Sequence, residues 1–108
     1  MPREDRRIIF DSVEVYKAIY ALSVQKEIRK PPPGVLESIV PDKDDPSKLK
    51  ATITNPQEKD STRVIEFSRD FLAAALLVFC RSQNIPVSKK ARKSVEFSGS
   101  DVVLRLEI

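Results

Sequence analysis

Histidine is absent from this chain of 108 residues, which removes the commonest general acid–base group and metal ligand. Without histidine, neither a serine triad nor a cysteine–histidine pair can be assembled. No other set of residues has the spacing of a catalytic, cofactor-binding or metal site. The sequence therefore predicts a protein that is not an enzyme and has no cofactor. Chemistry by carboxyl, tyrosine or lysine groups alone stays open as a distant alternative.

Glycine, cysteine and long apolar runs are also scarce. The two glycines argue against a glycine-rich phosphate loop, and the single Cys80 cannot form an internal disulfide, which fits a reducing compartment. The longest apolar run, residues 71–80, has about half the length that a membrane span needs. Residues 1–7 contain no apolar signal core. We therefore expect a cytoplasmic protein that does not contact a membrane.

The composition is that of a globular protein. Hydrophobic residues make up 41% of the chain and charged residues 32%. A chain of this length normally forms one domain, and it buries enough surface for a core without a metal or a disulfide. We expect a single domain over residues 1–108.

The sequence repeats itself at a spacing of 57 residues. Phe10 falls on Phe67, Leu22 on Phe79 and Ile28 on Ile85 when the first half is moved forward by this distance. Each half reads as an apolar strand ending in phenylalanine, a helix, a proline-containing turn and two further strands. Because internal repeats set the architecture, we predict two βαββ units, at about 6–54 and 62–108, which share one core.

Capping residues set the predicted starts of the two helices. Asp11 with Glu14 three residues later has the spacing of a capping box, and Ser68 stands at the equivalent place in the second half. The apolar spacing then predicts helices over about 12–27 and 69–83. The second helix is apolar nearly all round, so we expect it to be more deeply buried than the first or covered by a partner.

The strands show the alternation of a sheet with one covered face. Leu49, Ala51 and Ile53 alternate with polar neighbours, as do Leu104 and Leu106. We predict an α+β fold, a two-layer sandwich in the order βαβββαββ, with two helices on one face of a mostly antiparallel sheet. Asn84, which tolerates the left-handed conformation, is predicted to end the second helix.

A basic stretch gives the first candidate site. Residues 71–95 contain no acid, whereas Lys89, Lys90, Arg92 and Lys93 lie close together there. Such a loop could contact the phosphates of a nucleic acid with a strongly salt-dependent affinity. A solvated loop is the alternative, since the net charge is only +3 and no aromatic residue is interleaved to stack on bases.

The acidic run at residues 42–45 does not predict a calcium site. An EF-hand loop counted from Asp42 needs glycine at its sixth position and glutamate at its twelfth, and this chain has Ser47 and Ile53 there. A solvated acidic turn is the better interpretation, so no metal site is predicted.

The function favoured by the sequence is that of a small interaction module that binds a protein partner or its own copy. Tyr16 and Tyr20, one helical turn apart, are the candidate interface residues, and tyrosine is enriched at interfaces. The last strand, residues 102–108, would offer open backbone groups for pairing if it lay at a sheet edge. DNA or RNA binding by the basic stretch is the alternative function.

Overall fold

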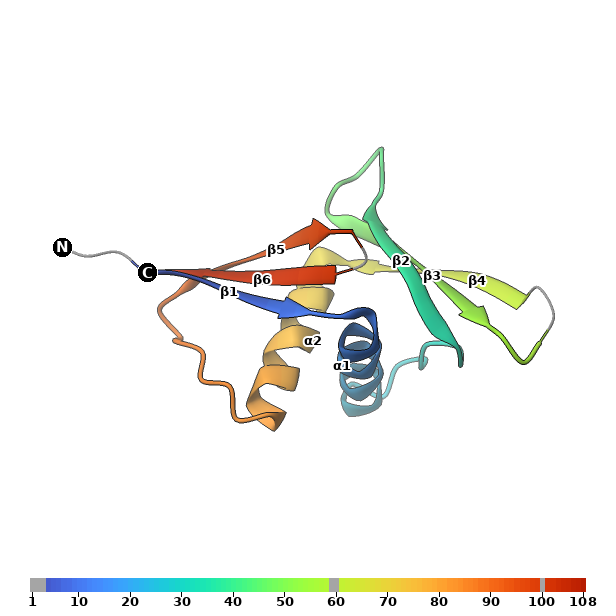
Figure 1. Ribbon diagram of the computed structural model, residues 1–108, viewed down its shortest axis with the longest axis horizontal. Coiled ribbons are helices and arrows are strands. Elements are labelled where there is room, and N and C mark those ends of the chain that lie inside the picture. Colours follow the sequence, from blue (N-terminus) through green and yellow to red (C-terminus); the bar gives the residue numbers. More distant parts are fainter. Residues whose placement is uncertain (1–3, 59–60, 100) are drawn as a thin grey trace.

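A computed structural model describes residues 4–58, 61–99 and 101–108 of the chain (Figure 1). It confirms the α+β class and the order βαβββαββ. The elements are β1 (Asp5–Phe10), α1 (Ser12–Gln25), β2 (Val35–Pro41), β3 (Lys48–Asn55), β4 (Ser61–Ser68), α2 (Arg69–Ser82), β5 (Arg92–Ser98) and β6 (Asp101–Glu107).

The strands form two three-stranded antiparallel sheets. Sheet A has the order β1-β6-β5 and sheet B the order β2-β3-β4. The two helices pack against each other and lie on the same side of the sheets, below them in Figure 1. The predicted covering of one face by two helices is therefore present, with the strands divided between two sheets.

Each half of the chain gives its first strand to the sheet of the other half. β1 pairs with β6, and β4 pairs with β3. When every element is exchanged for its counterpart, the order β1-β6-β5 becomes β4-β3-β2, which is sheet B read in reverse. A shift of 57 residues also carries the bounds of α1 onto α2 and those of β2 onto β5. The layout agrees with two related units, and a common origin of these units stays a prediction.

The last strand is central, so the condition under which it would offer open backbone groups for pairing is not met. β6 lies between β1 and β5. Its consecutive residues Val102, Val103 and Leu104 are all buried, although they alternate between the two faces of sheet A. A strand that is covered on both faces suits the middle of a sheet, and the continuous apolar run is the signal for it.

The predicted caps start both helices. The Asp11 carboxylate accepts a hydrogen bond from the Glu14 backbone N–H at 2.9 Å, and the Glu14 carboxylate accepts one from the Asp11 N–H at 3.1 Å. Ser68 Oγ accepts a hydrogen bond from the Phe71 N–H at 3.0 Å. These bonds satisfy backbone donors that have no partner within the helix.

The helices also end in the same way, one or two residues earlier than predicted. Asn84 has the expected left-handed φ of 57°, and Glu27, its counterpart in the first half, has a φ of 56°. After each of them the chain turns back, so that Ile28 N–H donates to the Ser23 carbonyl at 3.0 Å and Ile85 N–H donates to the Cys80 carbonyl at 2.8 Å. Sequence reasoning missed Glu27 because glutamate is not a residue that favours this conformation.

One hydrophobic core joins the helices to both sheets. Its largest fully buried side chains are Phe10, Leu49, Leu72, Leu76 and Leu104. α2 has fewer exposed residues than α1, yet many of its apolar residues are half-buried and not buried. The expected deep burial of α2 is thus only partly met, because the side of this helix that faces away from the core has no covering layer among the described residues.

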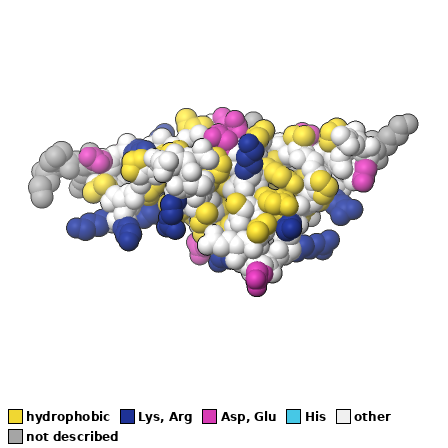
Figure 2. All heavy atoms as spheres, turned by 90° about the horizontal axis from the view of Figure 1, so that it is seen from below, with side chains coloured by type: hydrophobic (Ala, Val, Ile, Leu, Met, Phe, Trp, Pro, Cys, Tyr) yellow, Lys and Arg dark blue, Asp and Glu magenta, His cyan; other side chains and the backbone are white. Residues whose placement is uncertain are grey.

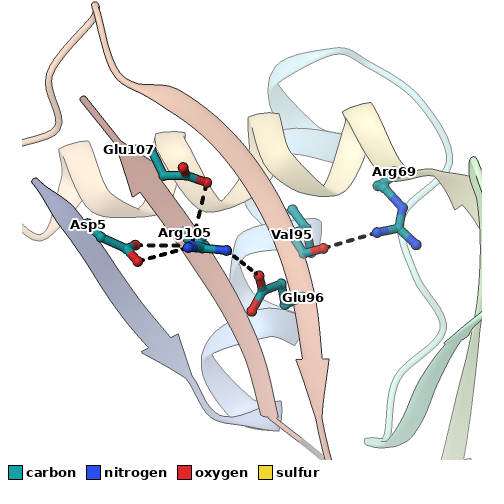
Figure 3. Close-up of polar contacts among 6 residues, drawn as sticks. All are labelled: Asp5, Arg69, Val95, Glu96, Arg105 and Glu107. Carbon is teal, nitrogen blue, oxygen red and sulfur yellow. Dashed lines mark hydrogen bonds and ion pairs between the residues drawn. The ribbon is translucent and has the colours of Figure 1, made fainter. Parts of the chain in front are cut away.

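Arg69, the first residue of α2, bonds to sheet A and to the loop that joins β2 to β3, and Figure 3 shows its bond to Val95 of β5. Its guanidinium donates to the Val95 carbonyl of sheet A at 3.0 Å and to the Pro46 carbonyl beside sheet B at 3.2 Å. The same group lies 5.4 Å from the ring centroid of Phe97. A single side chain therefore fixes the start of α2 relative to both sheets.

The outer face of sheet A carries a charged network around Arg105 (Figure 3). Its guanidinium donates two hydrogen bonds to the Asp5 carboxylate, at 3.0 and 2.9 Å, and lies 3.5 Å from the carboxylates of Glu96 and Glu107. The Arg105 hydrogen bond is the main cause that lowers the pKa of Asp5, and the charges of Arg105 and Arg7 add to it, while partial burial opposes it.

Acidification is expected to remove the contribution of Asp5 to stability. Because its pKa is lower in the folded state than the ordinary value of 3.8, the ionised carboxylate stabilises the fold above about pH 4, and this contribution is lost as the pH falls through the folded pKa. In thermal unfolding, Asp5→Asn should unfold at a lower temperature than the parent at neutral pH, and the difference should vanish in strong acid. Asp44→Asn, the same charge change in an exposed turn, is the control. A difference that persisted in strong acid would contradict the ionic role.

Candidate functional site

The described residues contain no candidate metal centre. No group of three or more histidine, cysteine, aspartate or glutamate side chains among residues 4–58, 61–99 and 101–108 could hold a metal ion. Cys80 is free and buried, and burial raises the pKa of its thiol despite the positive charge of Arg6. A thiol that is inaccessible and has a raised pKa is unreactive, so Cys80 acts as a small core residue. No helix in the described part of the chain is long and apolar enough to cross a membrane.

The acidic run forms a turn whose carboxylates accept hydrogen bonds from within the turn. Asp42 Oδ1 accepts a hydrogen bond from the Asp44 N–H at 2.9 Å, and Asp45 Oδ1 accepts bonds from the backbone and hydroxyl of Ser47. The bond from Asp44 is the main cause that lowers the pKa of Asp42, and the bonds from Ser47 lower that of Asp45. The acidic side chains thus hold the turn between β2 and β3.

The four residues of the basic stretch do not form one surface. Arg92 and Lys93 are successive residues of β5, so their side chains leave opposite faces of sheet A. The Lys93 ammonium donates to the Ala91 carbonyl at 3.0 Å, and Lys90 is exposed in the turn before β5. Lys89 and Lys93, together with Arg81, line a groove of about 610 Å³ at the C-terminal end of α2. Nucleic-acid binding by these residues stays a prediction, with two of the four predicted contacts in this groove.

A second groove lies along β4 and is here named the β4 groove. It has a volume of about 580 Å³, within the range of roughly 300–1,000 Å³ that ligand sites occupy. Its two walls are the linker at residues 28–32 and the strand at residues 63–68, and Ile19, Ser23 and Phe71 complete it. Figure 2 views the molecule from the helix side and shows hydrophobic side chains, with lysine and arginine around them, on the half of this face that belongs to α1 and sheet B.

The backbone edge of β4 faces this groove. β4 is an outer strand of sheet B, since its one partner in the sheet is β3. All six consecutive residues from Arg63 to Ser68 line the groove, although successive side chains of a strand point to opposite faces. All six can line the groove only if the backbone of the strand faces it. This backbone carries the unpaired N–H and C=O groups of an edge strand.

The proline run in the opposite wall cannot form a strand ladder with that edge. Residues 31–33 are three prolines, which have no backbone N–H to donate and do not fit within a sheet. The Tyr16 hydroxyl donates to the Pro32 carbonyl at 2.9 Å and so fixes the wall to α1. Burial, with a contribution from Tyr20, raises the pKa of Tyr16, so that the hydroxyl keeps the proton that it donates. The prolines therefore keep the edge of β4 uncovered.

The two tyrosines predicted as interface residues support this wall. Tyr16 and Tyr20 stack with ring centroids 6.3 Å apart, and the Lys30 ammonium lies 5.8 Å from the Tyr20 ring centroid. Tyr16 is half-buried against the core, whereas Tyr20 is 40% exposed. The structure thus places the pair behind residues 30–32, beside the β4 groove and outside its lining.

The rim of the β4 groove is positively charged. Arg29, Lys30 and Arg63 line it, against the single acid Glu66. The Glu66 carboxylate lies 3.9 Å from the Lys48 ammonium, and no acidic partner lies within 4.0 Å of the three basic groups among the described residues. The sequence did not predict Arg29 and Lys30 as site residues, because the prolines that follow them were read only as part of a turn. Two bases directly before a proline run are the signal that pointed to them.

In the other half of the chain, a hydrogen bond joins the equivalent outer strand to its linker. Arg6, the counterpart of Arg63, lies on β1, the outer strand of sheet A. Its guanidinium donates to the carbonyl of Pro86, the counterpart of Arg29, at 2.6 Å. This bond joins the strand to the linker that follows α2. The two halves therefore differ: the β1 edge is tied to its linker, and the β4 edge faces an open groove.

Comparisons with protein-family models, with curated proteins and with solved structures gave no match to this chain.

Proposed function

We propose that this protein is a non-enzymatic interaction module that binds an extended segment of a partner protein along β4. The observation that carries the proposal is the uncovered backbone edge of β4, which runs the length of a groove with apolar walls. An extended peptide can add a strand to such an edge, so that its main chain provides affinity while side-chain pockets provide specificity.

A single peptide segment suits the groove better than a second copy of the chain. The edge of β4 in a second copy has its own linker wall and proline run beside it. Pairing two β4 edges would therefore bring two linker walls into the same space, together with their basic side chains. An isolated segment brings neither, and homodimerisation through β4 becomes an outcome that the experiment below distinguishes.

A catalytic role for the grooves has less support. Among the described lining residues, the β4 groove has one acid, Glu66, and the groove that contains Lys89 has none. Neither groove offers the pair of carboxylates that hydrolytic chemistry without histidine would use. We also propose the cytoplasm as the place of action, since a buried free thiol at Cys80 suits a reducing compartment.

Selection from a random decapeptide display library tests the proposed function. We expect enriched peptides that bind the isolated protein and that perturb the NMR amide signals of residues 63–68 on titration. Amides of β4 that exchange freely in the unbound protein should become protected, whereas those of the outer strands β2 and β5 should not change. No enrichment over an unrelated control protein, or enriched peptides that shift only residues outside the β4 groove, would overturn the proposal. A dimer held through β4 in sedimentation experiments would replace it with self-association.

A further inference from the structure

We infer that the segment bound in the β4 groove is acidic at one end and hydrophobic at the other. This inference depends on the proposed function and specifies the chemistry of the partner. It follows from the unequal distribution of charged and aromatic side chains along β4.

One end of the groove is cationic. Arg63 stands at the start of the part of β4 that lines the groove, and it shares a small adjoining cavity with Pro32, Pro33 and one acid, Glu58, with which it forms no ion pair within 4.0 Å. Arg29 and Lys30 precede these prolines in the opposite wall, so three basic residues line the same groove. An acidic side chain placed there would pair with groups that have no ion-pair partner among the described residues.

The other end is aromatic and apolar. Phe67 lies near the end of β4 and Phe71 in the first turn of α2, with their ring centroids 5.8 Å apart. Both side chains are half-buried, and so is that of Ile65. Ile65 and Phe67 lie on the core-facing side of β4, because Ala51 and Leu49, which they pair with on β3, are both buried. Hydrophobic side chains of a bound strand would complete the burial of these groups.

The spacing sets the length of the segment. Arg63 and Phe67 are four residues apart, which is about 14 Å along an extended strand. A bound strand of matching length would therefore carry its acidic residue about four positions away from its hydrophobic anchor. Positive charge at the rim also disfavours basic segments, so charge selects among the many extended peptides that could pair with a bare edge.

Two labelled probe peptides test this inference. The first, Asp-Glu-Thr-Thr-Val-Thr-Val-Thr, has an acidic end and alternating valines, and the second replaces its two acids with lysines. By fluorescence anisotropy at low ionic strength, the acidic probe should bind about tenfold more tightly, and added salt should reduce the difference. Reversing the charge of the rim with Arg29→Glu and Arg63→Glu together should reverse the preference. Arg92→Glu, the same change on the outer face of sheet A, should leave the preference unchanged.

The outcomes separate the inference from the proposed function. If both probes bind equally and protect the β4 amides, the strand addition stands and the charge selection is overturned. If library selection yields binders at β4 without acidic residues, the same conclusion follows. A variant with reversed rim charge that retains the parental preference also overturns the inference, provided that its circular dichroism spectrum matches that of the parent. If neither probe nor any library peptide binds at β4, the proposed function itself fails.

Discussion

Phe10→Ala is expected to lower the free energy of unfolding by about 3–5 kcal/mol, the range for truncating a buried phenylalanine. Phe10 is 1% exposed, at the end of β1, and its ring meets Phe79 of α2 edge-on with centroids 5.8 Å apart. The substitution would leave a cavity where sheet A meets the helices. Urea unfolding followed by circular dichroism measures the effect.

Phe67→Ala is the matched control for this experiment. Phe67 holds the equivalent place in the second half but is only half-buried, so we expect a loss of about 1–2 kcal/mol, part of the transfer free energy of the ring. The order should reverse for peptide binding, which Phe67→Ala should weaken. Equal losses of stability in the two variants would show that the two halves bury their phenylalanines alike, against the structure.

Gly34→Ala is expected to destabilise the fold by about 3 kcal/mol, the upper part of the range for a strained backbone conformation. Gly34 lies before β2 with a φ of 145°, a conformation that side-chain-bearing residues rarely adopt. A Cβ atom there would lie 2.6 Å from the Thr54 carbonyl oxygen, so that the backbone of β2 or β3 must shift. Thermal unfolding monitored by circular dichroism measures the loss.

Gly99→Ala gives the comparison. Gly99 also has a positive φ, of 60°, but a Cβ atom there would meet nothing within 4 Å among the described residues. We expect a loss of about 1–2 kcal/mol from the left-handed conformation alone. If Gly34→Ala cost no more than Gly99→Ala, the close approach of Gly34 to β3 would not be a constraint on the fold.

The helix starts and ends could be predicted from the sequence because each is marked by residues within one helical turn. Asp11 with Glu14, and Ser68, mark helix starts through bonds within one turn, and Asn84 marks an end in the same way. The spacing of 57 residues likewise predicted equivalent elements in the two halves, because each half carries the same order of apolar segments and turns.

Strand pairing could not be predicted in the same way. Nothing in the alternation of β1 shows that its partner is β6, close to the other end of the chain. An alternating strand can pair with any other, and the choice depends on how the helices pack. For the same reason the sequence left open which strands lie at sheet edges, and β6 proves to be central while β4 is an outer strand. The groove arises only when β4, the proline wall and α1 come together, so no single segment predicts it.

The exchange of first strands between the halves affects how the chain can fold while it is being synthesised. β1 is synthesised before the other elements of this fold, whereas its partner β6 is synthesised after them. Sheet B can form once β4 has emerged from the ribosome, whereas sheet A must wait until β6 has emerged. Until then β1 lacks its sheet, and Phe10, which is buried in the complete fold, lacks part of its covering. A nascent chain stalled before residue 101 should therefore bind chaperones, and emergence of β6 from the ribosome should end that binding.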